Sequence, residues 1–363
     1  MNIIEKNRPH YPALDGLRGA AILFVVLYHN FSSFDYFFFG WLGVDLFFVL
    51  SGYLITDILL NTAGSANYLR NFFLRRILRI LPLYYLILII FFLILPGLNF
   101  YQGEFDFYLN HQPWFWFYLQ NWLLAFHFSL KGGYLAHLWS LGVEEQFYII
   151  WPFVVLWLRK PKLLLVFMLS LLLLIVITRG IIWFQNIEGL NYTNFYKFTR
   201  VDGICVGCII AILNHMDISY LKRRMPVIIL TLAAINFLFY FFNEPYGILP
   251  YLALVGYTTF AILFGFLVYE LVYGRNRLFN FIFSIRPLRF LGKISYGFYV
   301  FHLPIYIMLF QKTRQFIHDD LNIAGLGLNL LSSSLVTLIS FTISVISYYT
   351  YERMWLKLKK RFT

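Results

Sequence analysis

Charged residues are scarce in this chain. Asp, Glu, Lys and Arg make up 13% of its 363 residues, whereas hydrophobic residues make up 60%. A water-soluble globular protein has about a quarter charged residues, so the composition excludes an ordinary soluble fold. Long apolar runs alternate with short basic loops, which is typical of a protein that crosses the membrane several times.

Cysteine is almost absent. Cys205 and Cys208 are the two cysteines of the chain, in the stretch CVGC, and one such pair excludes a disulfide framework. The sequence has no further Cys or His cluster at a spacing that would complete a metal site. We therefore predict that both thiols pack inside a membrane helix and that the protein uses no metal.

The sequence also lacks a recognisable cleavable signal peptide, an internal repeat and a low-complexity linker. Its first apolar run follows Lys6, Arg8 and Pro12, and no small-residue cleavage site lies behind that run. These absences leave no room for an appended soluble domain. We expect one membrane-embedded domain over residues 1–363.

Apolar runs of spanning length predict an all-α integral membrane protein, a bundle of about ten transmembrane helices. The predicted spans are 13–32, 41–60, 77–96, 139–158, 163–184, 199–214, 226–243, 249–272, 291–310 and 328–351. The aromatic segment 113–130 is expected to form an interfacial or re-entrant helix. The alternative, an eleventh span, conflicts with the distribution of charge.

Basic residues are unequally divided between the two sides of this predicted bundle. Ten spans place both termini on one side, and most of the Lys and Arg residues fall on that side. The positive-inside rule therefore predicts cytoplasmic termini and a multi-pass protein of the inner (plasma) membrane. The net charge of +12 follows from this topology and from attraction to anionic headgroups, so it does not indicate nucleic-acid binding.

The first predicted helix carries two polar side chains, Arg18 near its inner end and His29 near its outer end. Eleven residues turn a helix by about 1100°, so the two side chains lie only about 20° apart around the axis and roughly 16 Å apart along it. In one interpretation Arg18 extends to the inner headgroups and His29 is a packed structural histidine. In the other, both face a functional site inside the bundle.

Acidic residues occur at the depth of His29 on two other predicted helices. Asp45 lies within about a turn of the outer end of its helix, and Glu144 and Glu145 lie in the outer part of theirs. Carboxylates inside a membrane normally face the bundle interior or a wet cavity. A carboxylate beside a histidine fixes the tautomer of a general base. We therefore expect one of these residues to orient His29, in an active site near the outer face.

The inner side carries a basic cluster of Arg75, Arg76 and Arg79. It either anchors the helix at the headgroups or, together with Arg18, binds a polyanion through guanidinium groups. A basic inner mouth, a polar track and an outer histidine fit a donor that is anionic at one end and reactive at the tip of a long arm. Acyl-coenzyme A has that shape. An ion or proton carrier also uses paired intramembrane charges, so this pattern leaves both classes open.

Several stretches occur together in one order along the chain: LDGLRGAAILFVVLYH, GWLGVDLFFVLSGYLIT, RRILRILPLYY, HLWSLGVEEQFYIIWP, TRVDGICVGCIIA, ISYGFYVFHLPI and TYERMWLK. In this order they resemble the acyltransferase-3 family of integral membrane O-acyltransferases, and the resemblance extends from about residue 10 to 355. Because the sequence ends at Thr363, it resembles the stand-alone members that lack a C-terminal periplasmic domain.

The resemblance implies transfer of an acyl group, most often acetyl, from cytoplasmic acyl-CoA to a hydroxyl of an envelope or exported glycan, such as O-antigen or exopolysaccharide. The expected partners are thus the lipid bilayer, acetyl-CoA as co-substrate and a glycan acceptor. The competing hypotheses are a transporter or flippase for a glycan or lipid-linked sugar, and a non-catalytic membrane subunit of a polysaccharide synthesis machine.

In the transferase hypothesis His29 is the general base or a transient acyl carrier. Glu144 is expected to orient it, with Glu145 and Asp45 as alternatives. The residues expected to bind the CoA phosphates are Arg18, Arg75, Arg76 and Arg79. The candidates for substrate or oxyanion contacts are Ser51, Ser140, Tyr148, Arg200 and His302. The histidines to which we assign no chemistry are His10, His111, His127, His137, His215 and His318.

Overall fold

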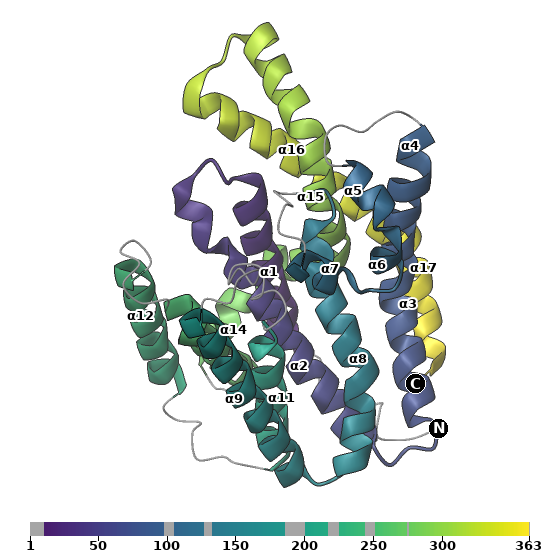
Figure 1. Cartoon of the computed structure of the whole chain (residues 1–363), viewed down its shortest axis with the longest axis vertical. Coiled ribbons are helices and arrows are strands. Elements are labelled where there is room, and N and C mark those ends of the chain that lie inside the picture. Colours follow the sequence, from purple (N-terminus) through teal and green to yellow (C-terminus); the bar gives the residue numbers. More distant parts are fainter. Residues whose placement is uncertain are drawn as a thin grey trace.

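The computed structural model describes residues 11–97, 105–126, 133–185, 200–216, 225–243, 251–273 and 276–362. Across these ranges the chain is helical and contains no strand. The main helices are α1 (Pro12–Asn30), α2 (Leu42–Thr62), α3 (Tyr68–Ile89), α8 (Trp139–Leu158), α9 (Pro161–Gln185), α11 (Asp202–His215), α12 (Met225–Asn243), α13 (Tyr257–Tyr273), α15 (Arg286–Leu321) and α16 (Gly325–Ser347). They form one bundle, from which α15 and α16 project at one end (Figure 1).

Shorter helical segments connect or extend these helices. The α-helical ones are α4 (Leu95–Gly97), α5 (Phe105–Asn110), α6 (Gln112–Trp116), α7 (Gln120–Phe126), α14 (Arg277–Ser284) and α17 (Arg353–Leu358). The 3₁₀ segments are η2 (Asp35–Trp41), η4 (Ala136–Leu138) and η8 (Lys359–Phe362), and the π segments are η3 (Ile90–Ile94), η6 (Leu252–Gly256) and η7 (Tyr348–Glu352). The aromatic segment 113–130 contains α6 and α7, each far too short to span a bilayer, and its residues 127–130 lie outside the described part.

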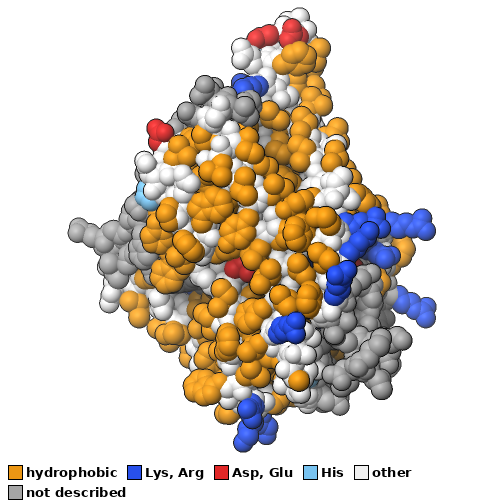
Figure 2. Space-filling model, turned by 90° about the vertical axis from the view of Figure 1, so that its right-hand side faces the viewer, with side chains coloured by type: hydrophobic (Ala, Val, Ile, Leu, Met, Phe, Trp, Pro, Cys, Tyr) orange, Lys and Arg blue, Asp and Glu red, His pale blue; other side chains and the backbone are white. Residues whose placement is uncertain are grey.

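Eight helical segments of the described chain are long and apolar enough to cross a membrane. They are Asp35–Thr62, Tyr68–Gly97, Ala136–Leu158, Pro161–Gln185, Met225–Phe242, Leu254–Tyr273, Arg286–Leu321 and Gly325–Leu358. Each coincides with one of the ten predicted spans, so the prediction of an all-α integral membrane bundle is confirmed. Apolar side chains cover much of the face in Figure 2, and Lys and Arg side chains gather at its lower and right-hand margins.

The other two predicted spans, 13–32 and 199–214, correspond to α1 and α11. Helix α1 carries Asp15, Arg18 and His29, and α11 is an apolar helix of 14 residues. Both pack inside the bundle, α1 against α2, α14 and α15, and α11 against α2, α9 and α13. The helix that carries Arg18 and His29 and the shortest main helix therefore pack against several other helices, which is where intramembrane polar groups are tolerated.

Glycines bring α1 and α15 unusually close together. A Cβ atom on Gly19 would lie 1.9 Å from the carbonyl oxygen of Leu288, and one on Gly292 would lie 1.8 Å from that of Asp15. Small residues let helix backbones approach within a membrane. These two positions therefore fix how α15 lies along α1, and with it which side chains of the two helices meet.

The CxxC stretch lies in α11, and its side chains are buried within the protein. Cys205 and Cys208 are free thiols, both buried, and the Cys208 thiol faces the Gly52 carbonyl oxygen at 3.7 Å. The prediction that both cysteines pack inside a helix is confirmed.

Candidate active site

Two histidines that are distant in sequence lie side by side in the bundle. His29 stands near the end of α1, and His302 lies in the middle of α15. Nδ1 of His29 is 3.1 Å from Nε2 of His302, and the ring centroids are 5.1 Å apart. His302 is completely buried, whereas His29 is partly exposed. Of the two residues, His29 is thus the more exposed.

A third imidazole, His137, adjoins this pair. Its ring lies 5.0 Å from that of His302 and 5.3 Å from that of Tyr299. The Tyr299 hydroxyl donates a hydrogen bond to the backbone oxygen of His137 at 2.6 Å, and the Ser140 hydroxyl lies 2.6 Å from the Tyr299 oxygen. His137 is one of the histidines to which the sequence assigns no chemistry. The available signal was its place in HLWS, three residues before Ser140.

The carboxylate expected beside His29 has other partners. Glu144 accepts a hydrogen bond from the Ser51 hydroxyl at 2.7 Å and another from the Tyr148 hydroxyl at 3.4 Å. The hydrogen of Tyr148 is shared between Glu144 and the Ser51 oxygen, which lies 3.0 Å from the Tyr148 oxygen. The Arg76 guanidinium lies over the Tyr148 ring at 5.5 Å. Within the described residues, the hydrogen bonds of Glu144 therefore go to hydroxyl groups on α2 and α8 rather than to His29.

Asp45 is bound by Arg200. Nε and Nη2 of Arg200 donate to the two carboxylate oxygens of Asp45 at 2.8 and 2.5 Å, and Nη2 also donates to the Trp41 carbonyl oxygen at 3.1 Å. The guanidinium lies 4.9 Å from the Trp41 ring and 5.0 Å from the Tyr257 ring. A bidentate pair of this kind is a strong interaction, and it occupies both oxygens of Asp45.

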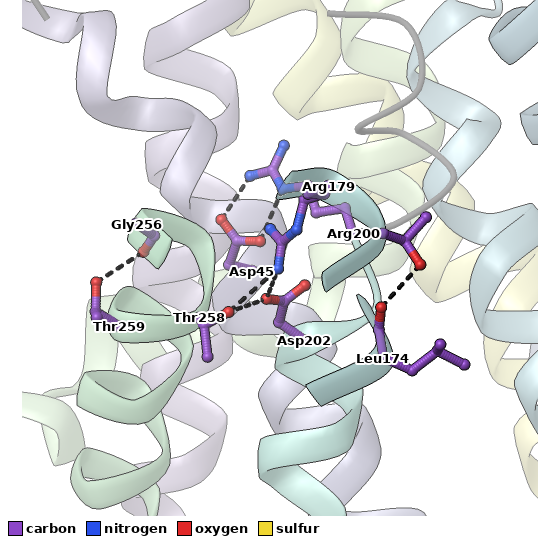
Figure 3. Close-up of polar contacts among 9 residues, drawn as sticks. Asp45, Leu174, Arg179, Arg200, Asp202, Gly256, Thr258 and Thr259 are labelled. Carbon is purple, nitrogen blue, oxygen red and sulfur yellow. Dashed lines mark hydrogen bonds and ion pairs between the residues drawn. The ribbon is translucent and has the colours of Figure 1, made fainter. Parts of the chain in front are cut away.

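A second buried ion pair stands next to the first. Arg179 of α9 pairs with Asp202 at the start of α11, and the Thr258 hydroxyl donates to the same carboxylate oxygen (Figure 3). The Arg179 guanidinium lies over the Tyr257 ring at 5.7 Å. The two pairs together connect α2, α9, α11 and α13. The sequence prediction did not single out Arg179 or Asp202 as partners.

A cavity extends through the bundle from the basic residues towards the histidines. The residues that line it are Arg18, Val44, Phe47, Phe48, Leu50, Ser51, Leu54, Ile55, Arg76, Arg79, Ile80, Ser140, Leu141, Glu144, Tyr148, Ser295, Tyr296 and Tyr299. Three guanidinium groups therefore share one cavity with Ser140 and Tyr299. The Tyr299 ring lies 5.7 Å from that of His302, so this wall of the cavity adjoins His302, although neither His302 nor His29 is among the lining residues.

The basic residues of the cavity have few close acidic partners. Arg18 pairs with Asp15 at 3.6 Å, one turn back along its own helix. Among the described residues, Arg76 and Arg79 have no carboxylate oxygen within 4.0 Å. Arg75 does not line the cavity. Glu145 lies near enough to Arg76 for the two charges to interact.

Lys359 adds a cation from the far end of the chain. It lies in η8, which packs against α3. Burial, and then repulsion from Arg79 and Arg76, lowers the pKa of Lys359 to about 6. An amine from the end of the chain therefore lies beside the arginines of α3. No local sequence pattern indicates that residue 359 lies against α3.

Comparison with known proteins assigns the chain to a family. A family model described as an acyltransferase domain, that of acyltransferase-3, matches residues 11–349. The peptidoglycan O-acetyltransferase OatA of Listeria monocytogenes is 33% identical over 321 residues, which cover 82% of this chain and 50% of that protein. The O-acetyltransferase OatA of Staphylococcus aureus is 31% identical over 327 residues, covering 83% and 51%.

The chain thus spans about half the length of these curated relatives. No solved structure matches it. The family match covers nearly all the described helices, and it confirms the resemblance that the sequence motifs indicated. The chain belongs to the acyltransferase-3 family.

Proposed function

We propose that this protein is a membrane O-acetyltransferase that moves an acetyl group from acetyl-CoA to a hydroxyl of peptidoglycan or a similar envelope glycan. The family supports acyl transfer, and the printed names of the relatives support acetyl as the group and peptidoglycan as the acceptor. The protein would lie in the inner (plasma) membrane, with the guanidinium cluster towards the cytoplasm and His29 near the outer face.

One observation carries this proposal: the cavity joins the guanidinium groups of Arg18, Arg76 and Arg79 to the wall next to the histidine pair. Guanidinium groups suit phosphate because they donate two parallel hydrogen bonds. The apolar side chains between the two ends suit the thin pantetheine arm. A carrier that moved a whole sugar would need a wider polar path.

In the proposed reaction Nε2 of His29 takes the proton of the acceptor hydroxyl while the hydroxyl oxygen attacks the thioester carbonyl carbon. The tetrahedral intermediate then collapses and the carbon–sulfur bond breaks. The departing thiolate takes the proton from His29, so the products are the glycan ester and free CoA. In the covalent variant, Nε2 attacks the thioester first and the acetyl group passes to the glycan in a second step.

Among the candidates for stabilising the oxyanion, Ser140 has the best position. Arg200 is fully engaged with Asp45, and Ser51 and Tyr148 donate to Glu144. The Ser140 hydroxyl lines the cavity beside Tyr299, and it donates to that neutral hydroxyl rather than to a carboxylate, so its hydrogen can turn to the oxyanion. A single oxyanion donor contributes about 10²–10³-fold to a rate, so Ser140→Ala should slow transfer by that factor.

The proposal is tested by the ester content of the glycan in cells that depend on this protein. His29→Ala should abolish glycan esters, detected by mass spectrometry before and after mild base, while glycan export continues. His318→Ala is the matched control, because His318 is an exposed histidine of α15. If export fails in the His29→Ala cells while ester content persists, the transporter or flippase hypothesis replaces this one.

A further inference from the structure

We propose that His302 is the positioning residue of the site: it holds His29 as the tautomer whose Nε2 is free to act. This inference rests on the proposed function, because it assigns His29 the reacting nitrogen. The role had been expected of a carboxylate, and Glu144 was the first candidate. The contacts of the two imidazole rings point to a histidine instead.

The first step concerns the proton on His302. Its Nδ1 lies 2.7 Å from the backbone oxygen of Tyr299 and 3.2 Å from that of Phe298. A carbonyl oxygen accepts hydrogen bonds and never donates them, so the hydrogen of these contacts is on Nδ1 of His302. In a neutral imidazole the other nitrogen then carries a lone pair. Nε2 of His302 is therefore an acceptor.

The second step passes this constraint to His29. Nε2 of His302 and Nδ1 of His29 are 3.1 Å apart, which is hydrogen-bonding distance for two ring nitrogens. Since Nε2 of His302 accepts, Nδ1 of His29 must donate and carry the hydrogen. The lone pair of neutral His29 is then on Nε2, the nitrogen that the proposed reaction requires.

The surroundings of His302 keep it neutral. Its side chain is completely buried, and no carboxylate hydrogen-bonds to it among the described residues. The groups that face it are the rings of His29, His137 and Tyr299. A charged imidazolium enclosed in this way would lack a counter-ion, and burial of an unpaired charge is very costly. When His29 becomes protonated, its Nδ1–H still donates to the lone pair on Nε2 of His302. This hydrogen bond stabilises the new positive charge.

This arrangement does the work of the carboxylate in a histidine–carboxylate pair, in which an acceptor on Nδ1 sets the tautomer and orientation of the base. It differs because a neutral acceptor leaves no net charge in the site between turnovers. In that respect it suits a site inside the membrane, where a permanent charge is costly.

Two substitutions of His302 separate positioning from packing. In His302→Gln the side-chain amide lies at about the place of Nε2 and can accept from His29. In His302→Asn it lies at about the place of Nδ1 and removes this acceptor, so the Val25 backbone oxygen is the partner left to His29. In reconstituted full-length protein supplied with acetyl-CoA and glycan, Asn should lower kcat by at least about 100-fold, whereas Gln should stay within about tenfold of wild type.

A second readout does not depend on activity. In protein labelled with ¹⁵N-histidine, the nitrogen shifts of His29 should show a protonated Nδ1 and a lone pair on Nε2, and His302→Asn should weaken this preference measurably. If Asn is as active as Gln, or if Nδ1 of wild-type His29 carries no hydrogen, His302 does not have this role. If wild type transfers no acetyl group while the shifts agree, the proposed function fails and the assignment of the tautomer stands.

Discussion

Two groups of buried or half-buried arginines behave differently in this bundle. The Arg200–Asp45 and Arg179–Asp202 pairs are nearly inaccessible to solvent, and each arginine bonds directly to a carboxylate. The basic group of Arg18, Arg76, Arg79 and Lys359 brings cations together with little close acidic compensation. In the first group each charge has a bonded counter-ion within the protein, whereas the second has guanidinium groups that face a cavity and are suited to an anion.

The contrast indicates which arginines serve the fold and which serve binding. Removing one member of a buried ion pair leaves the other charge unpaired, so such residues affect stability. Removing a cation from a like-charged group relieves repulsion, so such residues affect affinity for an anion. Three predictions test this division.

The largest expected effect is on stability. Arg200→Met should destabilise the protein by about 3–5 kcal/mol, because Asp45 is then buried without its partner. Thermal unfolding of the purified protein in detergent measures the loss. The double variant Arg200→Met with Asp45→Asn should recover most of it. If the single variant has the melting temperature of wild type, the Arg200–Asp45 pair does not stabilise the bundle, and the division into structural and binding arginines is wrong.

The next effect is on affinity with stability preserved. Arg79→Gln should weaken CoA binding by roughly 1.5–3 kcal/mol, the usual value for a hydrogen bond to a charged group, and leave the melting temperature unchanged or higher. Titration calorimetry with CoA measures it. Arg70→Gln is the control, since Arg70 is an exposed residue of the same helix, α3. Equal affinities for the two variants would place the phosphates elsewhere.

The smallest effect is a change in the pH dependence of stability. The pKa of Lys359 is about 6 in the folded protein against 10.5 ordinarily, so between these values the unfolded chain binds more protons. Stability from this residue therefore rises with pH through that window and is lost as pH falls towards 6. Lys359→Met should flatten the rise in melting temperature between pH 6.5 and 9. An unchanged pH profile would show that Lys359 is not buried among the arginines.

The helices were largely predictable because apolar runs are a local signal. The predicted span 139–158 coincides with α8, whereas α15 continues well beyond the predicted 291–310, since the stretch from Gln311 to Leu321 is helical but too polar to be recognised as a span. Helices α1 and α11 were predicted as spans from their apolar runs. Their own composition does not indicate that neighbouring helices bury them.

Polar residues of the bundle interior were selected from sequence, but their pairing was not predictable. His29, Glu144, Asp45 and Arg200 were all selected from sequence, yet which one contacts which depends on helix packing. Glycines at the crossing of α1 and α15 help to bring His302 to His29 across 273 positions of the chain. Depth along the helices made Glu144 the first candidate to orient His29 and Asp45 an alternative, but depth does not reveal that Ser51 and Arg200 engage these carboxylates.

The most direct test of the account is acetyl transfer across oriented vesicles that contain the full-length protein. Labelled acetyl-CoA is supplied to the face that carries the arginine cluster, and a glycan acceptor is supplied to the other. We predict labelled, base-labile ester on the glycan with wild type and with His318→Ala, and none with His29→Ala. Label that never reaches the glycan with wild type, or that reaches it equally with His29→Ala, would contradict the account.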